Sequence, residues 1–472
     1  MNQKIFQIKW KQGCFYYFPL AAKIQLQSAG FSTDKNNGLA SEALARFRSG
    51  SDSQQEITIT KSVPLPLVFR QQNSPRLMAE AFHPICLTLY LNHQCNLACA
   101  YCYRPANENS TLNNINLAAV EAAAEFVAHN CVRRKSPFIL GFHGDNEPLL
   151  HLGLLKKCLE ICRRIAQKYD LPLLTFCTTN GVISPGTAEW AVQHFYGITL
   201  SWDGLDEIHD RFRPQKEGRP TAEFVRRTAS IFLRRDARLR QFKVRATVTH
   251  SSVNQLLEIV QFFHRHQVRW VEMYPVYQNT SQSLDQSLLP GKVEFVQNFL
   301  KARQWAQTHG MRLGYAGSRL ADFHHRHCPL FQNNLTLTPD GFLTACFQIT
   351  HNQRPQNEPF IYGSFDHHQQ QLKINRVQLT HIFAQLTQTA TPCQTCFNYW
   401  HCARGCPNGC PLQSIESFSN EADCTVERWI GLANLLEATG YKLTENDLAD
   451  CQKFFYNISV QDVTPEKIDA PV

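Results

Sequence analysis

The sequence predicts an α/β fold followed by a cysteine-rich C-terminal region. Between residues 82 and 278, short apolar stretches alternate with longer amphipathic ones, a pattern typical of parallel strands joined by helices. The chain has 472 residues, 43% of them hydrophobic, which is enough for two or three domains with a sizeable core. No cysteine lies between Cys177 and Cys328, whereas seven lie from Cys328 to Cys410. This clustering indicates metal ligands.

The first 81 residues precede the alternating pattern. Residues 6–20 are rich in aromatic side chains and predict a hairpin. Residues 57–60 and 65–69 predict short strands, and Pro66 restricts the second to a sheet edge. We interpret residues 1–81 as a β-rich region that packs against the following domain; a module that grips a peptide is the alternative.

Six strands form the alternating part. They are expected at residues 85–91, 138–142, 171–178, 197–201, 242–248 and 268–274. Helices are expected at residues 117–130, 152–169, 221–234 and 254–266. Strands that alternate with helices in this way form parallel βα units.

The chain beyond the last of these strands is less regular. Residues 279–291 are polar and predict a loop that bounds the domain, and residues 292–309 predict a helix. The sequence Thr-Pro-Asp-Gly at residues 338–341 predicts a turn between two short strands. Residues 426–438 predict a final helix.

Charge and hydropathy exclude some partners. The net charge is +8, but the 47 basic residues are spread along the chain, and we interpret the basic stretch 226–240 as a solvated helix face. No nucleic-acid partner is therefore expected. No run of 18 apolar residues exists, and the polar first ten residues lack the apolar core of a signal peptide. We expect a cytoplasmic protein without a membrane partner, in which the 18 cysteines stay reduced.

The loop after the first strand contains Cys95, Cys99 and Cys102, a C-x3-C-x2-C triplet. Three thiolates at this spacing can hold three irons of a 4Fe–4S cube, whereas such clusters normally take four cysteines. Zinc is the alternative, but zinc prefers paired C-x2-C or Cys/His arms. With Tyr101 before the last cysteine, the triplet resembles that of the radical S-adenosylmethionine (SAM) superfamily. In that family SAM chelates the fourth iron.

The end of the second strand carries a further mark of this family. Residues 143–148 are His-Gly-Asp-Asn-Glu-Pro, similar to the Gly-Gly-Glu-Pro motif whose backbone receives the SAM amino group. Asp145 and Asn146 stand in place of the glycine pair. Because Asp and Asn tolerate left-handed backbone better than other non-glycine residues, the turn can be retained.

Two more strand ends resemble the family. Residues 178–181 are Thr-Thr-Asn-Gly, and residues 201–204 are Ser-Trp-Asp-Gly, followed by His-Asp-Arg-Phe-Arg-Pro at 209–214. The last run resembles the Ser-Leu-Asp-Gly … His-Asp-x-x-Arg run of peptide-modifying members. Each motif alone is common in turns, but their order at strand ends favours the family. The resemblance implies SAM contacts from Tyr101, Gly144, Asp145, Asn146, Glu147, Asn180 and Ser201.

The C-terminal cysteines resemble the seven-cysteine SPASM extension of peptide-modifying radical SAM enzymes. Cys328 precedes Gly341 and Cys346, and a C-x2-C-x5-C-x3-C run then precedes Cys424. The resemblance implies two auxiliary 4Fe–4S clusters, one on Cys393, Cys396, Cys402 and Cys424 and the other on Cys328, Cys346 and Cys406. Zinc is again the alternative for a four-cysteine set.

The second auxiliary cluster has only three cysteines of the family type. Fully ligated members carry another cysteine shortly before the first of the seven, and residues 316–327 contain none. Three alternatives stay open: an open iron, a histidine ligand as in Rieske centres, or a further cysteine. The candidate residues are His324, His325, His327 and Cys410.

The resemblance implies a partial (β/α)6 TIM barrel with a C-terminal cysteine-rich iron–sulfur domain. In such a barrel the strand carboxyl ends carry the site. The expected division is an N-terminal region 1–81, a barrel 82–278, a linker and helix 279–327, a SPASM domain 328–424, and a C-terminal helix and tail 425–472.

The resemblance also implies a function. Such an enzyme uses an electron from its reduced cluster to cleave SAM to a 5′-deoxyadenosyl radical, which abstracts hydrogen from a C–H bond; the protein positions that bond. The implied substrate is a precursor peptide that is cross-linked, cyclised, epimerised or excised, and the implied electron donor is a flavodoxin or ferredoxin. The sequence identifies no catalytic base.

Two other functions are weighed against this one. A sulfatase-type formylglycine maturase would carry an aspartate after the second cysteine of the extension, where this chain has Phe347. A non-catalytic iron–sulfur or zinc scaffold would have no need of the SAM motifs, although the altered pair Asp145-Asn146 is compatible with it.

Overall fold

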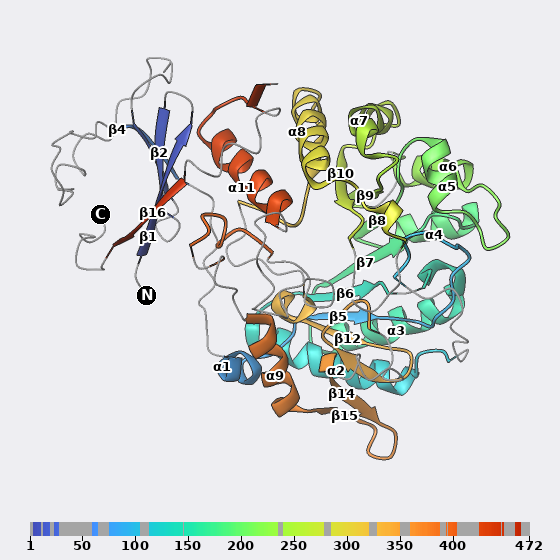
Figure 1. Ribbon diagram of the computed structural model, residues 1–472. Helices are drawn as coiled ribbons and strands as arrows, with labels where there is room; N and C mark the ends of the chain where they lie inside the picture. Colours follow the sequence, from blue (N-terminus) through green and yellow to red (C-terminus); the bar gives the residue numbers. More distant parts are fainter. Residues whose placement is uncertain are drawn as a thin grey trace.

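The computed structural model describes most of the central part of the chain and shorter pieces at both ends. The described residues are 3–10, 13–18, 23–27, 59–64, 75–103, 113–144, 146–234, 239–277, 285–320, 328–349, 359–387, 393, 395–403, 424–444, 446–447 and 458–463. They form an eleven-stranded sheet and a separate five-stranded sheet (Figure 1). No helix in this part of the chain combines the length and apolar character needed to cross a bilayer.

Six parallel strands in sequence order form the centre of the large sheet. They are β5 (Cys86–Leu89), β6 (Phe138–Phe142), β7 (Leu173–Thr179), β8 (Gly197–Ser201), β9 (Gln241–Val248) and β10 (Trp270–Pro275). The helices between them are α2 (Leu117–Arg134), α3 (Leu152–Lys168), α4 (Pro185–His194), α5 (Asp206–Phe212), α6 (Ala222–Phe232) and α7 (Leu256–Arg265). The predicted α/β fold with a parallel sheet is confirmed. The sequence did not predict α4 and α5.

The C-terminal region extends the same sheet. β12 (Asn334–Leu337) lies parallel to β5, and β13 (Phe342–Thr344), β14 (Ile361–Asp366) and β15 (Gln371–Ile374) continue antiparallel from it. The predicted turn between β12 and β13 is confirmed, with Gly341 at a φ of 81° that suits glycine. At the other edge, β11 (Arg312–Gly314) lies parallel to β10. Because β12 pairs with β5, the first barrel strand is not a free edge.

Among the described residues, four further α-helices flank the sheet: α1 (Pro75–Glu80), α8 (Lys292–Thr308), α9 (Arg376–Thr387) and α11 (Thr425–Ala438). The predicted helices at 292–309 and 426–438 are confirmed as α8 and α11. Arg303 on α8 joins these two, since its guanidinium donates to Asn434 Oδ1 at 2.8 Å and to Glu437 Oε1 at 2.7 Å. The C-terminal helix is thereby fixed to the barrel side of the molecule.

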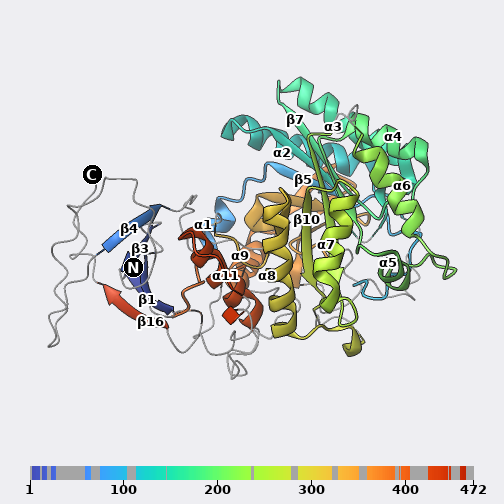
Figure 2. The ribbon, with the colours of Figure 1, turned by 90° about the horizontal axis from the view of Figure 1, so that it is seen from above.

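The five-stranded sheet combines both ends of the chain in the order β16-β1-β2-β3-β4. Its strands are β1 (Gln3–Trp10), β2 (Gly13–Phe18), β3 (Lys23–Gln27), β4 (Ile59–Pro64) and β16 (Ile458–Val463). The predicted N-terminal hairpin is confirmed as β1 and β2; residues 65–69 lie outside the described part. In both views this sheet lies at one end of the molecule, with α11 between it and α8 (Figures 1 and 2). The buried Tyr17 hydroxyl contacts His401 Nε2 in the cysteine-rich region.

Candidate active site

The loop with the cysteine triplet follows β5 and is fixed by backbone hydrogen bonds. The N–H groups of Ala98 and Ala100 donate to the carbonyls of Pro214 and Phe212, each at 2.9 Å. On the opposite side, the N–H of Glu147 donates to the carbonyl of Gln94 at 2.9 Å. The His-Asp-Arg-Phe-Arg-Pro run and the turn after β6 therefore hold the loop from two sides.

The three thiols of the triplet lie close enough to influence one another's protonation. Burial raises the pKa of the Cys99 thiol to about 12, although the guanidinium of Arg213 acts against this shift. Two donors point toward the sulfurs: Asn180 Nδ2 lies 3.7 Å from Cys95 Sγ, and Arg213 Nη1 lies 4.0 Å from Cys99 Sγ. Thiols in such surroundings become thiolates when a metal replaces their protons. Nearby donors then stabilise the negative sulfurs, so these residues fit an iron–sulfur cluster.

A buried ion pair lies directly behind the triplet. Arg213 Nε donates to Asp203 Oδ2 at 3.0 Å, and the Tyr101 hydroxyl donates to the same oxygen. The other carboxylate oxygen accepts from the N–H of Thr247 at 2.9 Å. The guanidinium also lies over the Tyr101 ring, 5.2 Å from its centroid. The expected cofactor contact Tyr101 therefore has its hydroxyl engaged within the protein, and Asp203 joins the cysteine loop to β9.

The His-Asp pair of the same run is structural in this fold. His209 Nδ1 accepts from the N–H of Asp203 at 3.2 Å, and burial lowers the pKa of this imidazole to about 4, so it is neutral at pH 7. Asp210 Oδ1 accepts from the N–H groups of Thr221 and Ala222 at 2.6 and 2.7 Å, which satisfies donors at the start of α6. Both side chains thus accept from backbone N–H groups of nearby residues.

The turn after β6 offers an unsatisfied acceptor. Gly144 has a φ of 137°, and an added Cβ would lie 2.6 Å from the Tyr90 ring. Asn146 Nδ2 contacts Asn92 Oδ1 at 3.4 Å, but the buried Asn146 Oδ1 accepts no hydrogen bond from any described residue. An ammonium group would supply that missing donor, so the turn fits the SAM amino group. Asp145 lies outside the described residues.

Glu147 clamps this turn to the end of β7. Its Oε1 accepts from Thr179 Oγ1 at 2.8 Å and from the N–H of Leu149 at 3.1 Å, and its Oε2 accepts from the N–H of Asn180 at 2.6 Å. Burial raises the pKa of this carboxyl to about 7. Of the expected SAM contacts, Glu147 therefore has both oxygens occupied, and Asn180 uses its side chain on Asn96 and on Cys95.

We expect Glu147→Gln to lower the free energy of unfolding by about 1–3 kcal/mol, the usual effect of a buried donor left unpaired. In either orientation, the new amide nitrogen would face a backbone N–H, that of Leu149 or of Asn180. Anaerobic urea denaturation measures the change. Glu217→Gln, at an exposed loop position, is the control and should change stability by less than about 0.5 kcal/mol. Equal values for both variants would contradict the clamp.

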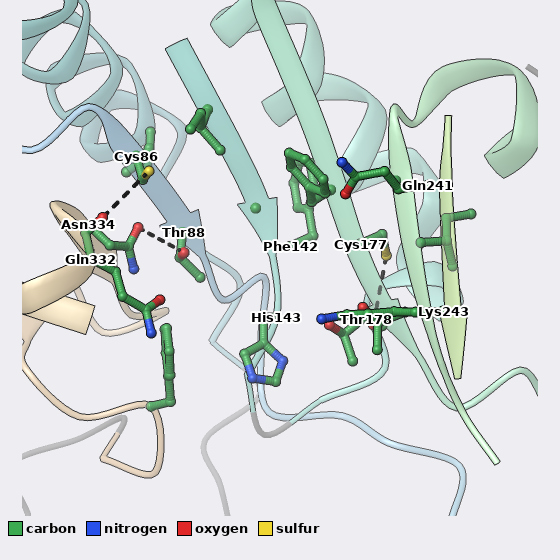
Figure 3. Close-up of a pocket in the computed structure, with 18 residues that line it drawn as sticks. Cys86, Thr88, Phe142, His143, Cys177, Thr178, Gln241, Lys243, Gln332 and Asn334 are labelled. Carbon is green, nitrogen blue, oxygen red and sulfur yellow. Dashed lines mark hydrogen bonds between the residues drawn. The ribbon is translucent and has the colours of Figure 1, made fainter. Parts of the chain in front are cut away.

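A cavity of about 340 Å³ lies along the sheet beneath these loops. β5 to β9 line it on one side, and Gln332, Asn334 and Phe347 of the C-terminal region line it on the other. In Figure 3, His143 lies in the middle of the view, with Thr178 and Lys243 on one side and Gln332 on the other. Phe347 also packs on His143, with ring centroids 5.3 Å apart. The cavity therefore brings barrel and C-terminal residues together next to the predicted SAM site.

The C-terminal cysteines lie at the ends of regular elements. Cys328 precedes the 3-10 helix Pro329–Gln332, Cys346 follows β13, and Cys424 is the residue before α11. A turn-rich segment that ends with residue 403 contains Cys393, Cys396 and Cys402; the next described residue is Cys424. Five predicted ligands or ligand candidates lie outside the described residues: Cys406, Cys410, His324, His325 and His327. Within the described residues, no three His, Cys, Asp or Glu side chains converge on the position of a single metal ion.

Asn398 links two parts of one predicted auxiliary site. It lies between Cys396 and Cys402, and its Nδ2 donates to the carbonyl of Glu427 at 2.7 Å, one turn after Cys424. Its Oδ1 accepts from Ser318 Oγ at 3.1 Å. The cysteine segment is thus fixed to the start of α11, as the predicted ligand set of Cys393, Cys396, Cys402 and Cys424 requires.

We expect Gly431→Ala to disturb this auxiliary site. A Cβ at position 431 would lie 2.4 Å from Asn398 Oδ1, so the linking side chain must move. Iron content should fall by about four per chain, from the roughly twelve that three 4Fe–4S clusters contain. Gly153→Ala in α3 is a matched helical control, because nothing lies within 4 Å of the added Cβ. Unchanged iron in both variants would contradict the link.

The sequence reasoning missed three charged residues on the inner face of the barrel, Lys243, Arg245 and Glu272. A signal was present: β9 reads Gln-Phe-Lys-Val-Arg-Ala-Thr-Val, so its charges alternate with the buried Val244, Ala246 and Val248. Strands of parallel sheets are usually apolar on both faces. Charges on such a strand therefore indicate an open, functional inner face.

The known proteins to which this chain is similar include anaerobic sulfatase-maturating enzymes. No protein-family model matches the sequence. A serine-type anaerobic sulfatase-maturating enzyme from Klebsiella aerogenes is 26% identical over 368 residues, which are 72% of this chain and 84% of that protein. A cysteine-type anaerobic sulfatase-maturating enzyme from Clostridium perfringens is 23% identical over 180 residues, 38% of this chain and 48% of that protein.

Solved structures show the same fold. The structure titled native anSMEcpe with bound AdoMet and Cp18Cys peptide superposes with a TM-score of 0.56 at 17% identity, covering 76% of this chain and 97% of that one. Streptococcus suis SuiB bound to precursor peptide SuiA superposes with a TM-score of 0.51 at 15% identity, covering 72% and 76%. The predicted partial barrel is confirmed by these likenesses.

Proposed function

Because the chain is a radical SAM enzyme with a SPASM-type C-terminal region, we propose that it modifies a residue within a ribosomally synthesised peptide. Its cofactors are SAM, a SAM-binding 4Fe–4S cluster and auxiliary 4Fe–4S clusters. When bound, SAM and its cluster supply a 5′-deoxyadenosyl radical that takes hydrogen from a C–H bond. A flavodoxin or ferredoxin would deliver the electron.

The proposal rests on one observation: the cysteine loop is hydrogen-bonded to the turn after β6. Cys95, Cys99 and Cys102 would hold the cluster. Asn146 Oδ1 would accept from the amino group of SAM, and the next residue, Glu147, donates its N–H to the Gln94 carbonyl. Asn180 and Arg213 would donate to the cysteine sulfurs. The cavity beside Phe347 would receive the peptide residue and exclude bulk water.

The chemical change made on the peptide has two candidates. Relatives named as serine-type and cysteine-type sulfatase-maturating enzymes favour oxidation of a serine or cysteine to formylglycine. Phe347 favours a different change, since its side chain offers no base where that family carries an aspartate. Its ring instead packs on His143, and its carbonyl accepts from the Tyr90 hydroxyl at 2.9 Å.

Two steps test the proposal. Anaerobic, reconstituted protein with dithionite and SAM should form 5′-deoxyadenosine, and zinc in place of iron in anaerobically purified protein would contradict the proposal. Co-expression with a small precursor gene encoded beside this one, followed by tandem mass spectrometry, should then locate the modified residue. An aldehyde on a serine or cysteine in sulfatase-derived peptides would select the formylglycine reaction.

A further inference from the structure

The inner face of the barrel carries more positive than negative charge next to the predicted SAM site. Lys243 and Arg245 lie on β9, Glu272 lies on β10, and Arg319 follows β11. Lys243 Nζ lies 3.4 Å from Glu272 Oε2, and Arg319 Nη2 lies 4.0 Å from Glu272 Oε1. Glu272 is thus paired with Lys243 and Arg319, and together with Arg245 the four residues carry an excess of two positive charges.

Glu272 is committed to this cluster. Its Oε2 also accepts from the Tyr274 hydroxyl at 3.0 Å. Burial alone would raise the pKa of this carboxyl, but Lys243, Arg319 and the tyrosine together hold it below its usual range. The carboxylate is therefore charged at neutral pH and already occupied by Lys243 and Arg319. It leaves Arg245 without compensation.

Arg245 is the cation of this face that pairs with no described carboxylate. Its side chain is exposed, and its guanidinium lies over the Tyr274 ring, 4.4 Å from the centroid. It forms no ion pair and no side-chain hydrogen bond with any residue that the structure describes. Stacking fixes the plane of a guanidinium while leaving its N–H fork free, and that fork matches a carboxylate in a bidentate manner.

The position of Arg245 relates it to the reaction. In the sheet register it lies opposite Ser201 on one neighbouring strand and opposite Glu272 on the other. Two residues further along β9, Thr247 accepts from Arg213 Nη2 at 3.4 Å, and Arg213 reaches Cys99. Lys243, two residues in the other direction, lines the cavity. The excess charge therefore lies between the cysteine loop and the cavity.

Resting on the proposed function, we infer that Arg245, supported by Lys243 and Arg319, binds an acidic side chain of the peptide next to the residue that is modified. A ligand that enters this face meets Arg245, the cation that Glu272 leaves uncompensated, and an acidic residue of the peptide can pair with it. The preferred substrates are therefore peptides with aspartate or glutamate close to the target residue. The other carboxylate that can reach this face is that of SAM, and the test separates the two.

The probes are two fluorescent heptapeptides of the same length, one with two glutamates flanking a serine and one with glutamines in their place. Fluorescence anisotropy with the anaerobic holoenzyme and SAM measures both affinities. We expect the acidic peptide to bind at least tenfold more tightly, and Arg245→Gln to reduce this preference to less than twofold. Arg245→Lys keeps the charge but loses the fork, and should give an intermediate preference. Iron content and circular dichroism verify folding of each variant.

Arg164→Gln is the control, because Arg164 lies on the outer side of α3 and pairs there with Glu121; it should keep the full preference. Equal binding of the two peptides by the wild type, or an unchanged preference in Arg245→Gln, would overturn the inference. A weaker SAM affinity in Arg245→Gln by equilibrium dialysis, with the preference retained, would assign Arg245 to the SAM carboxylate instead. Wild-type formation of 5′-deoxyadenosine without peptide shows separately whether the SAM cleavage that the proposed function requires takes place.

Discussion

Replacing Cys99 by alanine should abolish formation of 5′-deoxyadenosine from SAM. Cys99 is the central thiol of the triplet, and it is the one that Arg213 approaches. Without it the loop offers two cysteines, too few to hold a 4Fe–4S cluster with one open iron. Anaerobic assays with dithionite and SAM, read by chromatography, should give no more product than a reaction without enzyme.

Cys158→Ala is the matched control for this experiment. Cys158 is fully buried on α3, and the described structure places it in the apolar core rather than in the site. Its loss should leave the yield of 5′-deoxyadenosine within about twofold of the wild type, since cysteine here acts as a small apolar residue. A Cys99→Ala protein that still cleaves SAM would remove the triplet as cluster ligand.

The local pattern of the chain predicts its strands well but not their partners. β6 and β8 occur at the predicted residues, because short apolar runs flanked by loop residues identify a strand without knowledge of its neighbours. The pairing of Leu87 with Leu335 and of Phe6 with Val460 joins distant segments. Periodicity carries no information about such partners.

The candidate site, too, could be predicted from the sequence only in part. Spacing alone predicts the cysteine triplet, since its three cysteines lie within one short loop, from residue 95 to residue 102. The roles of Asp203 and Arg213 depend on how residues 209–214 are placed against the cysteine loop. The spacing of residues along the sequence does not determine that placement. Glu147 shows the converse: its motif predicts a SAM contact, yet its carboxylate is bonded to Thr179 and Asn180. The assignments of Asp145 and Cys406 remain predictions.

Asp203→Asn should be the most destabilising single substitution in the site. Both carboxylate oxygens accept from donors. In the variant, the amide nitrogen would therefore face another donor, either the Arg213 guanidinium or the Thr247 N–H. Arg213 is buried, and a buried charge that loses its partner costs about 3–5 kcal/mol. Anaerobic urea denaturation should show this loss. Iron content should fall with it, because Tyr101 and Arg213 also support the cysteine loop.

Asp206→Asn, three residues away, provides the control for Asp203→Asn. Asp206 forms an ion pair of 2.8 Å with Arg226, but both side chains are 38% exposed, and such surface pairs contribute about 0–1 kcal/mol. Adding Arg213→Met to Asp203→Asn removes the unpaired charge, so the double variant should recover part of the lost stability. If Asp203→Asn were no less stable than Asp206→Asn, the ion pair would not be what holds the cysteine loop in place.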